Sequence, residues 1–335
     1  MGGHAKTLIT PSIMSFVERS LGGRIRLTEI AGDASTRRFY RISSGKKSAV
    51  LMVHPDPLSY DSPLFSNHRV LESIGAPVPR ILDSEPEQGL VIVEDFGDLT
   101  LHRYLLARDG AARSREAVSL YGQACDLIVL FHQKGATALT PGDFASTCAL
   151  DRDRFLLELV HFHAHYILGH RKLVPGPGEE ALLRVFYADL AVECDRLPRV
   201  YCHRDFQSRN LMVRRGDLRL IDFQDGRMGP YTYDAASLLR DSSLDLHERL
   251  VGDMIARLCG RLGHEIDEFR RDFDLMALQR NIKDLGTFGF MAAVRGRPEY
   301  LEYLPRTLRF IRHTLVRSRR YHVFFPVLER YVLGG

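Results

Sequence analysis

The sequence predicts an α+β fold with two lobes, a small one built on an antiparallel sheet and a larger, mostly helical one. Short β-like runs separated by turn residues fill much of residues 24–93, helical periodicity dominates after about residue 100, and one β-rich interruption lies at residues 200–223. The chain has 335 residues, 45% of them hydrophobic and 26% charged, which is typical of a globular protein with room for two domains.

The first expected elements are a helix and a three-stranded meander. Thr10 and Pro11 form a favourable helix start, a hydroxyl N-cap followed by proline, and the helical pattern of residues 12–21 ends at Gly22. Turn-forming segments then separate three β-like runs, at residues 24–30, 38–42 and 48–53. We therefore expect three consecutive antiparallel strands.

A second helix and two further strands complete the expected small lobe. The helix covers residues 62–73, and the strands cover residues 80–83 and 90–93. After an acidic Glu-Asp-Phe-Gly-Asp segment the pattern becomes mostly helical. We divide the chain into a small lobe at residues 1–95, a connector at 96–99 and a large lobe at 100–335. A cleft between two lobes is a common place for a ligand.

Charge and cysteine content predict a cytoplasmic protein and give no sign of a nucleic-acid partner. The net charge is +4, and this scattered surplus gives no reason to expect a nucleic-acid partner. No apolar run is long enough to cross a membrane, and no secretory signal pattern is visible, so we expect no membrane association. The five widely spaced cysteines indicate reduced thiols. We also expect no obligate protein partner.

Residues 201–222 have the spacing of a catalytic segment. Asp205 follows His203 by two positions, Asn210 comes five positions later, and Asp222 ends an apolar run. Apolar runs on both sides of an Arg-Arg-Gly-Asp turn predict a tight hairpin that brings Asn210 and Asp222 together. An amide oxygen and a carboxylate at one point suit a hard cation such as Mg²⁺. Asp205 would remain free to orient a substrate hydroxyl and accept its proton, as in phosphoryl transfer.

The longer pattern resembles a known superfamily, the aminoglycoside and choline phosphotransferases, which have a protein-kinase-like fold. The similarity lies in H-R-D-F-Q-S-R-N-L-M, in L-I-D-F-Q-D and in G-P-x-x-Y-D-A-A-S-L-L-R-D. Within this superfamily the chain is most similar to the anomeric cell-wall amino-sugar kinases, through G-D-A-S-T-R-R-F-Y-R at residues 32–41 and L-x-x-L-P-R at residues 301–306. The resemblance extends from about residue 15 to residue 320.

The resemblance implies an ATP-dependent kinase that uses Mg²⁺. It assigns Asp205 to orienting and deprotonating the acceptor hydroxyl, and Asn210 and Asp222 to holding the metal ions. The implied acceptor is the anomeric 1-hydroxyl of N-acetylglucosamine, N-acetylmuramate or a related amino sugar, with a role in cell-wall recycling. Two alternatives remain, an aminoglycoside or choline-type kinase of the same fold and a catalytically silent nucleotide-binding pseudokinase.

The turn between the first two strands is expected to cover the nucleotide phosphates with backbone N–H groups. A kinase of this pattern would carry a lysine on the third strand, but this chain has Met52, and residues 64–70 include no acidic partner for such a lysine. We therefore expect an arginine to contact the phosphates. The predicted phosphate-side residues are Gly32, Ser35, Thr36 and Arg37.

The segment that joins the two lobes resembles a connector that reads adenine. An adenine edge needs one backbone carbonyl and one backbone N–H, and we expect the backbones of Glu94 and Phe96 to supply them. The identity of the side chains matters little for such contacts.

The acceptor pocket is expected around Asp205. Asp225 could touch the substrate or only hold its loop, and both roles stay open. His161 and His165 would share one helix face with Glu158. No fourth ligand accompanies them, which disfavours a zinc site. The face fits either the wall of a sugar-binding pocket or a plain helix surface. Residues 261–335 carry 14 Arg and Lys against 9 Asp and Glu, a bias against a polycationic acceptor. The predicted acceptor-binding residues are Asp205, Asp225, Glu158, His161 and His165.

Overall fold

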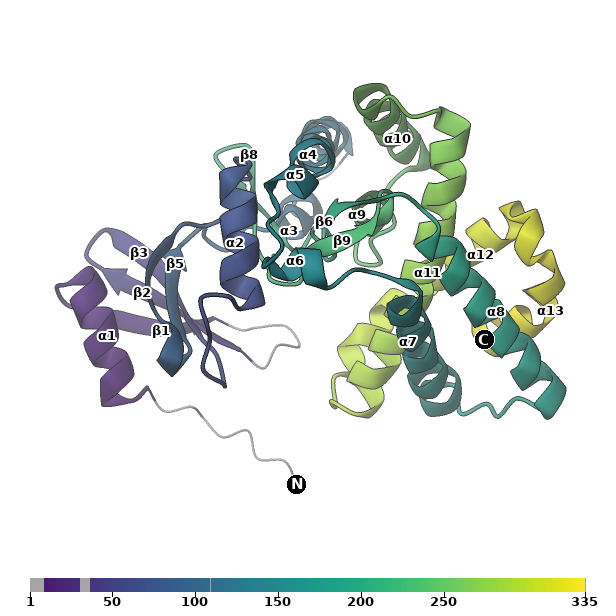
Figure 1. Ribbon diagram of the computed structural model, residues 1–335, viewed down its shortest axis with the longest axis horizontal. Coiled ribbons are helices and arrows are strands. Elements are labelled where there is room, and N and C mark those ends of the chain that lie inside the picture. Colours follow the sequence, from purple (N-terminus) through teal and green to yellow (C-terminus); the bar gives the residue numbers. More distant parts are fainter. Residues whose placement is uncertain (1–8, 31–36, 109, 335) are drawn as a thin grey trace.

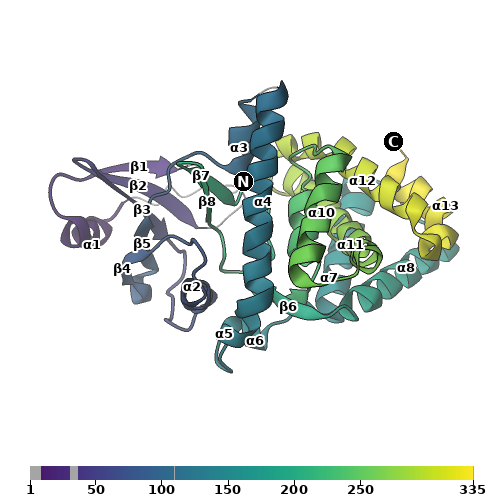
Figure 2. The same ribbon diagram turned by 90° about the horizontal axis from the view of Figure 1, so that it is seen from above.

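The computed structural model describes residues 9–30, 37–108 and 110–334. A small β-rich part lies at one end of its longest axis, and most of the helices lie at the other (Figure 1). Seen from above, the long helix α4 (Gly110–Leu130) stands between the sheet, with its helices α1 and α2, and the later helices α8, α10, α12 and α13 (Figure 2). The chain therefore has the two unequal parts that its sequence pattern predicts.

Five antiparallel strands form the sheet of the small part, in the order β1-β2-β3-β5-β4. In the register of this sheet Leu51 lies opposite both Tyr40 and Ile92. The predicted three-stranded meander is thus confirmed, and the later pair of strands joins the same sheet. The strands are β1 (Arg26–Ile30), β2 (Arg38–Ser44), β3 (Lys47–Val53), β4 (Ile81–Glu85) and β5 (Leu90–Glu94).

One helix covers each face of this sheet, α1 (Pro11–Leu21) on the outer face and α2 (Pro63–Ser73) on the inner face (Figure 1). Alternation along β5 supplies both faces with apolar side chains. Leu90 and Ile92 belong to the apolar cluster beneath α1, whereas Val91 and Val93 belong to the main core that includes α2. The helix start at Thr10 is confirmed, since its hydroxyl accepts a hydrogen bond from the Ile13 N–H.

An arginine on the sheet fixes the segment that follows β5. The Arg41 guanidinium donates to Asp95 at 2.7 Å and to Asp98 at 2.8 Å. Because one planar guanidinium binds both carboxylates, the segment that contains Asp95 and Asp98 has a fixed position relative to β2. The sheet and the start of the large part therefore keep a defined relative position.

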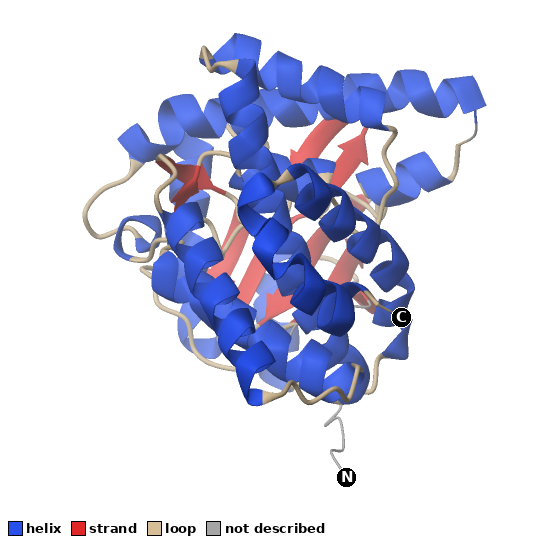
Figure 3. Ribbon diagram, turned by 90° about the vertical axis from the view of Figure 1, so that its right-hand side faces the viewer, coloured by secondary structure: helices blue, strands red, loops and turns tan. Residues whose placement is uncertain are grey.

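Helices make up most of the remaining chain, and Figure 3 shows them in front of the strands. Short 3₁₀ segments lie at Pro86–Gln88, Pro298–Tyr303 and Arg319–Phe324, and π-helical segments lie at Phe131–Gly135, His163–His170 and Glu329–Leu333. The helices are α3 (Leu101–Leu106), α4 (Gly110–Leu130), α5 (Ala136–Ala138), α6 (Phe144–Thr147), α7 (Arg152–Phe162), α8 (Pro177–Asp195), α9 (Tyr233–Leu239), α10 (Glu248–Leu262), α11 (Ile266–Ala293), α12 (Leu304–Arg317) and α13 (Phe325–Leu328).

Two glycines let α11 approach α7 and the π-helical segment after it. A Cβ atom on Gly286 would lie 2.6 Å from the Cα of Phe162, and one on Gly289 would clash with the carbonyl oxygen of His165. Only a residue without a side chain fits at such a crossing. The close approach brings polar residues of α7 and α11 to one place.

Two small ribbons interrupt the helices. They pair β6 (Arg199–Cys202) with β9 (Arg227–Pro230), and β7 (Leu211–Arg214) with β8 (Asp217–Leu220). Arg215 and Gly216 have φ values of +56° and +88°, which is the backbone of a type I′ turn, so the predicted tight hairpin is confirmed. Residues 203–210, between β6 and β7, form the predicted catalytic loop.

The α+β fold class, with a small antiparallel sheet and many helices, is confirmed. The division at residues 96–99 stays a prediction. Among residues 9–30, 37–108 and 110–334, no helix is both long and apolar enough to span a membrane.

Candidate active site

A cavity of about 990 Å³ lies between the five-stranded sheet and the β7–β8 hairpin. Its lining includes Arg37, Glu94 at the end of β5 and Phe96 of the predicted connector from one side, and Asn210 and Asp222 from the other. Residues far apart in the sequence, predicted separately as nucleotide-binding and metal-binding, thus share one cavity.

Buried carboxylates hold the catalytic loop at both ends. Asp234, at the start of α9, accepts hydrogen bonds from the backbone N–H groups of His203 at 2.7 Å and Arg204 at 3.0 Å. Burial raises the pKa of Asp234 to about 6. At the other end, Asp241 accepts from the backbone N–H of Ser208 at 2.9 Å and from its hydroxyl at 2.6 Å. The backbone around Asp205 is therefore fixed by two separate braces.

Left-handed backbone conformations shape the segments around Asp205 and Asp222. Arg204 has a φ of +76° and Asp222 a φ of +62°, a region that non-glycine residues rarely occupy. The His203 ring donates to the carbonyl of Ile221 at 3.0 Å, and the Ile221 N–H donates to the carbonyl of Asn210 at 3.1 Å. These bonds tie the loop to the end of the hairpin, so Asn210 and Asp222 are brought together as predicted.

Asp205 is surrounded by positive charge. Burial by itself would raise its pKa, but Lys283, Arg204 and Arg280 outweigh that effect and lower the pKa to about 2. The Lys283 ammonium lies 3.9 Å from Asp205 Oδ1. The side chain of Asp205 retains 27% of its exposure. Asp205 is thus an ionised carboxylate that an acceptor hydroxyl can still reach.

Asn210 and Asp222 offer oxygen ligands suited to a divalent cation. The Asn210 amide nitrogen donates to the backbone carbonyl of Asp205 at 2.9 Å, which leaves its Oδ1 as an available acceptor. Within the described residues no group of three or more His, Cys, Asp or Glu could hold a metal by itself. Two protein oxygens fit an ion such as Mg²⁺, which takes its other ligands from phosphate and water.

Arg37 lines this cavity and is paired with Asp222. Its guanidinium donates to Asp222 Oδ1 at 2.9 Å and its side chain is 16% exposed. Met52 lines the same cavity, whereas Lys46 and Lys47 are exposed residues that do not line it. Of these three cations Arg37 lines the cavity and the two lysines do not, and contact of Arg37 with phosphates stays a prediction.

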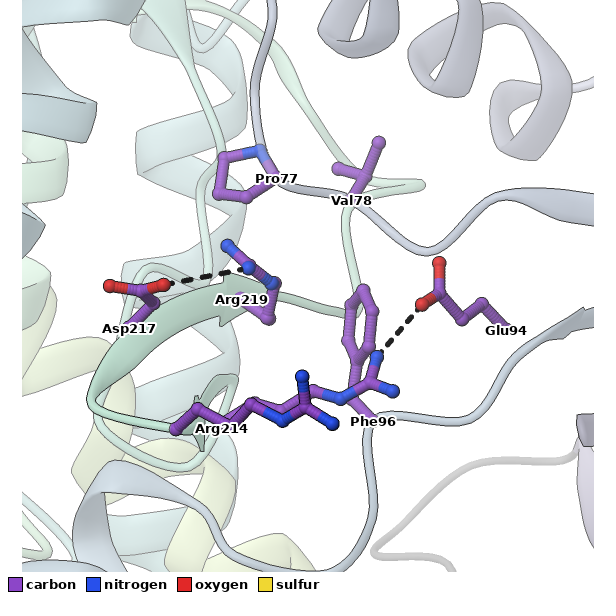
Figure 4. A pocket seen from close by; sticks show the side chains of 8 residues that line it. Pro77, Val78, Glu94, Phe96, Arg214, Asp217 and Arg219 are labelled. Carbon is purple, nitrogen blue, oxygen red and sulfur yellow. Dashed lines mark hydrogen bonds and ion pairs between the residues drawn. The ribbon is translucent and has the colours of Figure 1, made fainter. Parts of the chain in front are cut away.

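Glu94, at the end of β5, and Phe96, in the predicted connector, both line this cavity. The Glu94 carboxylate accepts from Arg214 at 2.8 Å and from Arg80 at 3.3 Å. Glu94 and Phe96 also line a second cavity of about 490 Å³, in which Arg214 lies beside the Phe96 ring (Figure 4). Among the described residues the Phe96 N–H has no hydrogen-bond partner, so it is available to a ligand edge.

Glu158 and Asp225 both hold Arg204. Glu158 is 9% exposed and accepts from Arg204 at 3.3 Å and from Gln279 at 2.9 Å. Asp225 lies 3.2 Å from the Arg204 guanidinium and 3.1 Å from that of Arg227. The ion pairs of Asp225 favour a role in holding its loop. Contact of Glu158 or Asp225 with an acceptor stays a prediction.

His161 and His165 form an aromatic group with Phe290. The two imidazole centroids are 4.3 Å apart, and they lie 5.6 Å and 5.0 Å from the Phe290 ring. Burial, then the neighbouring His165, lowers the pKa of His161, and Lys283 adds to this shift. The predicted shared helix face is present and adjoins the Lys283 side of Asp205. Contact of these rings with an acceptor stays a prediction.

Sequence reasoning did not identify Lys283 or Asn67 as site residues. Asn67, on α2, donates to the backbone carbonyls of Gln224 at 2.9 Å and Gly226 at 3.0 Å, and so ties that helix to the segment after Asp222. The scarcity of lysine, six in the whole chain, was a signal for Lys283. Nothing in the local pattern marks Asn67.

Three predicted phosphate-side residues, Gly32, Ser35 and Thr36, lie outside the described residues. Their contacts with a nucleotide stay predictions.

Comparison with known proteins gives a consistent result over most of the chain. Residues 26–270 match the family model described as the phosphotransferase enzyme family. A protein of Pseudomonas aeruginosa named N-acetylmuramate/N-acetylglucosamine kinase is 30% identical, over 87% of this chain and 84% of its own length. A protein of the same name from Neisseria meningitidis serogroup B is 29% identical, over 90% of this chain and 88% of its own.

Solved structures share the fold at much lower identity. The gentamicin complex of APH(2")-IIa superposes with a TM-score of 0.63 at 14% identity, covering 90% of this chain and 96% of that one. A choline/ethanolamine kinase family protein from Mesorhizobium loti gives a TM-score of 0.60 at 12% identity, covering 96% of each chain. At these identities the likeness shows the fold and no more.

Proposed function

The chain belongs to the phosphotransferase enzyme family, and from this premise we propose that it is an ATP- and Mg²⁺-dependent kinase of the anomeric 1-hydroxyl of an amino sugar. N-acetylmuramate and N-acetylglucosamine are the acceptors named for the curated relatives, which are similar over most of both chains. The observation that carries the proposal is that Asn210 and Asp222 line the same cavity as Glu94 and Phe96, while the Asn210 amide is hydrogen-bonded to the backbone carbonyl of Asp205.

The adenine is placed against the connector in this proposal. The Phe96 N–H and the backbone carbonyl of Glu94 would pair with its edge, between apolar side chains of the sheet and of the hairpin such as Val50 and Met212. The phosphates would then extend toward Arg37 and Asp222 at the other end of the same cavity. An arginine suits this place because its fork can bind two phosphate oxygens at once.

Each residue of the catalytic segment has one task in the proposed mechanism. Asp205 orients the acceptor hydroxyl and accepts its proton, while the acceptor oxygen bonds to the γ-phosphorus and the bond from phosphorus to ADP breaks. Asn210 and Asp222 would hold Mg²⁺, which when bound neutralises charge on the phosphates. The braces at Asp234 and Asp241 keep the loop in place while this happens.

The charges around Asp205 support a neutral or anionic acceptor. Lys283, Arg204 and Arg280 all lower the pKa of Asp205 against the effect of its burial, so three cations lie near this carboxylate. A polycationic aminoglycoside would meet like charges in a partly buried site, which is unfavourable. An N-acetylated sugar, or one with a carboxylate, meets no such repulsion.

Acceptor preference tests the proposal. ADP release is measured with Mg-ATP and four acceptors, namely N-acetylglucosamine, N-acetylmuramate, kanamycin and choline. We expect the highest kcat/KM with one of the two amino sugars. A higher kcat/KM with kanamycin or choline would overturn the acceptor assignment. Binding of ATP without ADP release from any acceptor would instead identify a silent nucleotide-binding module.

A further inference from the structure

Lys283 differs from the other two cations near Asp205 in what it contacts. Arg280 donates to the backbone carbonyl of Arg204 at 2.9 Å and to the Tyr233 hydroxyl at 3.1 Å. Arg204 is paired with Glu158 and Asp225. Both arginines are therefore occupied by groups of the protein.

The Lys283 ammonium has no hydrogen-bond partner among the residues that the structure describes. Its recorded ion pair is with Asp205 at 3.9 Å, beyond hydrogen-bond distance, although its side chain is only 16% exposed. Burial by itself would lower the pKa of Lys283, but Tyr233, Asp205 and Glu158 outweigh that effect and raise it. A charged ammonium with three donors is thus held inside the site and left available to a ligand.

The position of Lys283 is fixed by the packing of α11. Gly286, one turn further along, rests on the backbone of Phe162 with no room for a side chain. Lys283 is three positions before Gly286 and therefore lies on the same face of α11, toward α7. Its ion pair with Asp205 agrees with this orientation. The ammonium is presented by the longest helix of the described chain, which is a rigid support.

From this geometry we propose that Lys283 binds the phosphoryl group during its transfer from ATP to the acceptor, which extends the proposed function and rests on it. An acceptor hydroxyl that donates to Asp205 lies about 3 Å from that carboxylate, and the phosphorus lies about 3 to 3.5 Å from the hydroxyl oxygen. An ammonium beside the same carboxylate can therefore reach the phosphoryl oxygens. A substituent on another ring carbon of the sugar would be several bonds further away.

The transfer step assigns no proton to Lys283. The hydroxyl proton passes to Asp205, a lone pair of the acceptor oxygen forms the new bond to phosphorus, and the electrons of the broken bond stay on the ADP oxygen. Negative charge spreads over the three remaining phosphoryl oxygens at that moment. Lys283 stays protonated throughout and stabilises that charge, as a preorganised cation does.

The test compares Lys283→Met with Lys283→Arg and with a matched control, Lys134→Met, an exposed lysine remote from the site in sequence. We expect Lys283→Met to lower kcat about 10²-fold with both N-acetylglucosamine and N-acetylmuramate, the scale for loss of one donor to a transition state. The KM for ATP should change little. Lys283→Arg keeps the charge and should recover much of kcat, and Lys134→Met should behave as wild type.

A binding measurement separates contact with the phosphoryl group from general damage. ADP with aluminium fluoride mimics the phosphoryl group in transfer, so Lys283→Met should weaken its binding relative to ADP alone. Unchanged kcat, or a loss confined to the KM for N-acetylmuramate, would overturn the assignment, the latter by placing Lys283 on the acceptor carboxylate. If Lys283→Met binds no ADP because it is misfolded, Lys283→Gln replaces it. Failure of the proposed function is distinguishable from failure of the Lys283 assignment, because the wild-type protein would then be inactive with both sugars.

Discussion

Asp205 illustrates how a single residue acquires its chemistry from the groups around it. A carboxylate as enclosed as this one would hold its proton more tightly than in water, yet the three neighbouring cations reverse that tendency and lower its pKa to about 2. The cations belong to the loop itself and to α11, elements that lie some eighty positions apart in the chain. The ionised form that the proposed mechanism needs is therefore a property of the fold and not of the loop motif alone.

Asp205→Asn should lower kcat by at least about 10²-fold while nucleotide affinity is retained, because an amide cannot accept the hydroxyl proton and Asp205 does not line the nucleotide cavity. Turnover assays and titration with an ATP analogue measure the two quantities. Asp217→Asn, the same change at a carboxylate of the β7–β8 hairpin that is 65% exposed, is the control. Near-normal turnover of Asp205→Asn would remove Asp205 from the mechanism.

Arg37→Ala should weaken ATP binding by about tenfold, a typical loss for one charge-assisted contact. The physical reason is the position of Arg37 beside Asp222. Strand β3 contributes Met52 to the same cavity and no lysine. Calorimetric titration with Mg-ATP measures the effect, and Lys46→Ala should leave the affinity near that of wild type. A large loss for Lys46→Ala alone would show that the turn lysine binds the phosphates.

Sequence spacing predicted the candidate site residues that lie within one segment of the chain, residues 201–222. That Asn210 lies near Asp222 could be predicted because the β7–β8 hairpin between them returns the chain, and the catalytic roles of Asp205, Asn210 and Asp222 stay predictions. Lys283 and Asn67 could not be found in this way, since each reaches the site from a helix that is distant in sequence. The roles of Glu158 and Asp225 were also beyond local reasoning, because both depend on where the Arg204 side chain lies.

At the scale of elements, the crossing of α11 with α7 positions the residues of the proposed acceptor side. Gly286→Ala should lower the free energy of unfolding by about 1 to 3 kcal/mol, since its Cβ would press on the backbone of Phe162 and backbone atoms cannot give way as a side-chain end can. Urea denaturation measures this change. We also expect reduced turnover, because the shifted helix carries Lys283.

Gly260→Ala is the matched control for this prediction. Gly260 lies within α10, and a Cβ there would meet nothing within 4 Å. Its replacement should raise the free energy of unfolding by about 0.5 to 1 kcal/mol through helix propensity alone. Equal effects of the two substitutions would show that Gly286 is not a packing constraint.

Elements with a clear period were predictable, and elements without one were not. The meander and the hairpin follow from turn residues and alternating apolar positions, and each is present in the structure. Strand β9 was not expected, because its sequence Arg-Met-Gly-Pro combines two residues that disfavour strands. It forms because β6 offers a partner across a long separation in sequence, with Pro230 at the end of the ladder.

At the scale of the whole molecule, one cavity between the sheet and the β7–β8 hairpin is lined by residues predicted separately to bind nucleotide and metal. The sheet brings Arg37 and the connector, and the hairpin brings Asn210 and Asp222. The bias of residues 261–335 toward positive charge has a local counterpart in Lys283 and Arg280 near Asp205. All five cysteines are free, which agrees with the prediction of reduced thiols, and the cytoplasmic location stays a prediction.

The position of the phosphate in the product tests the proposed reaction most directly. Wild-type protein is incubated with Mg-ATP and N-acetylglucosamine or N-acetylmuramate, and the product is examined by phosphorus–proton correlation NMR. We expect the phosphorus to couple to the anomeric proton at C1, with Asp205→Asn forming little product under the same conditions. Coupling to the protons at C6, or phosphate transfer to kanamycin but to neither sugar, would contradict the assignment of an anomeric amino-sugar kinase.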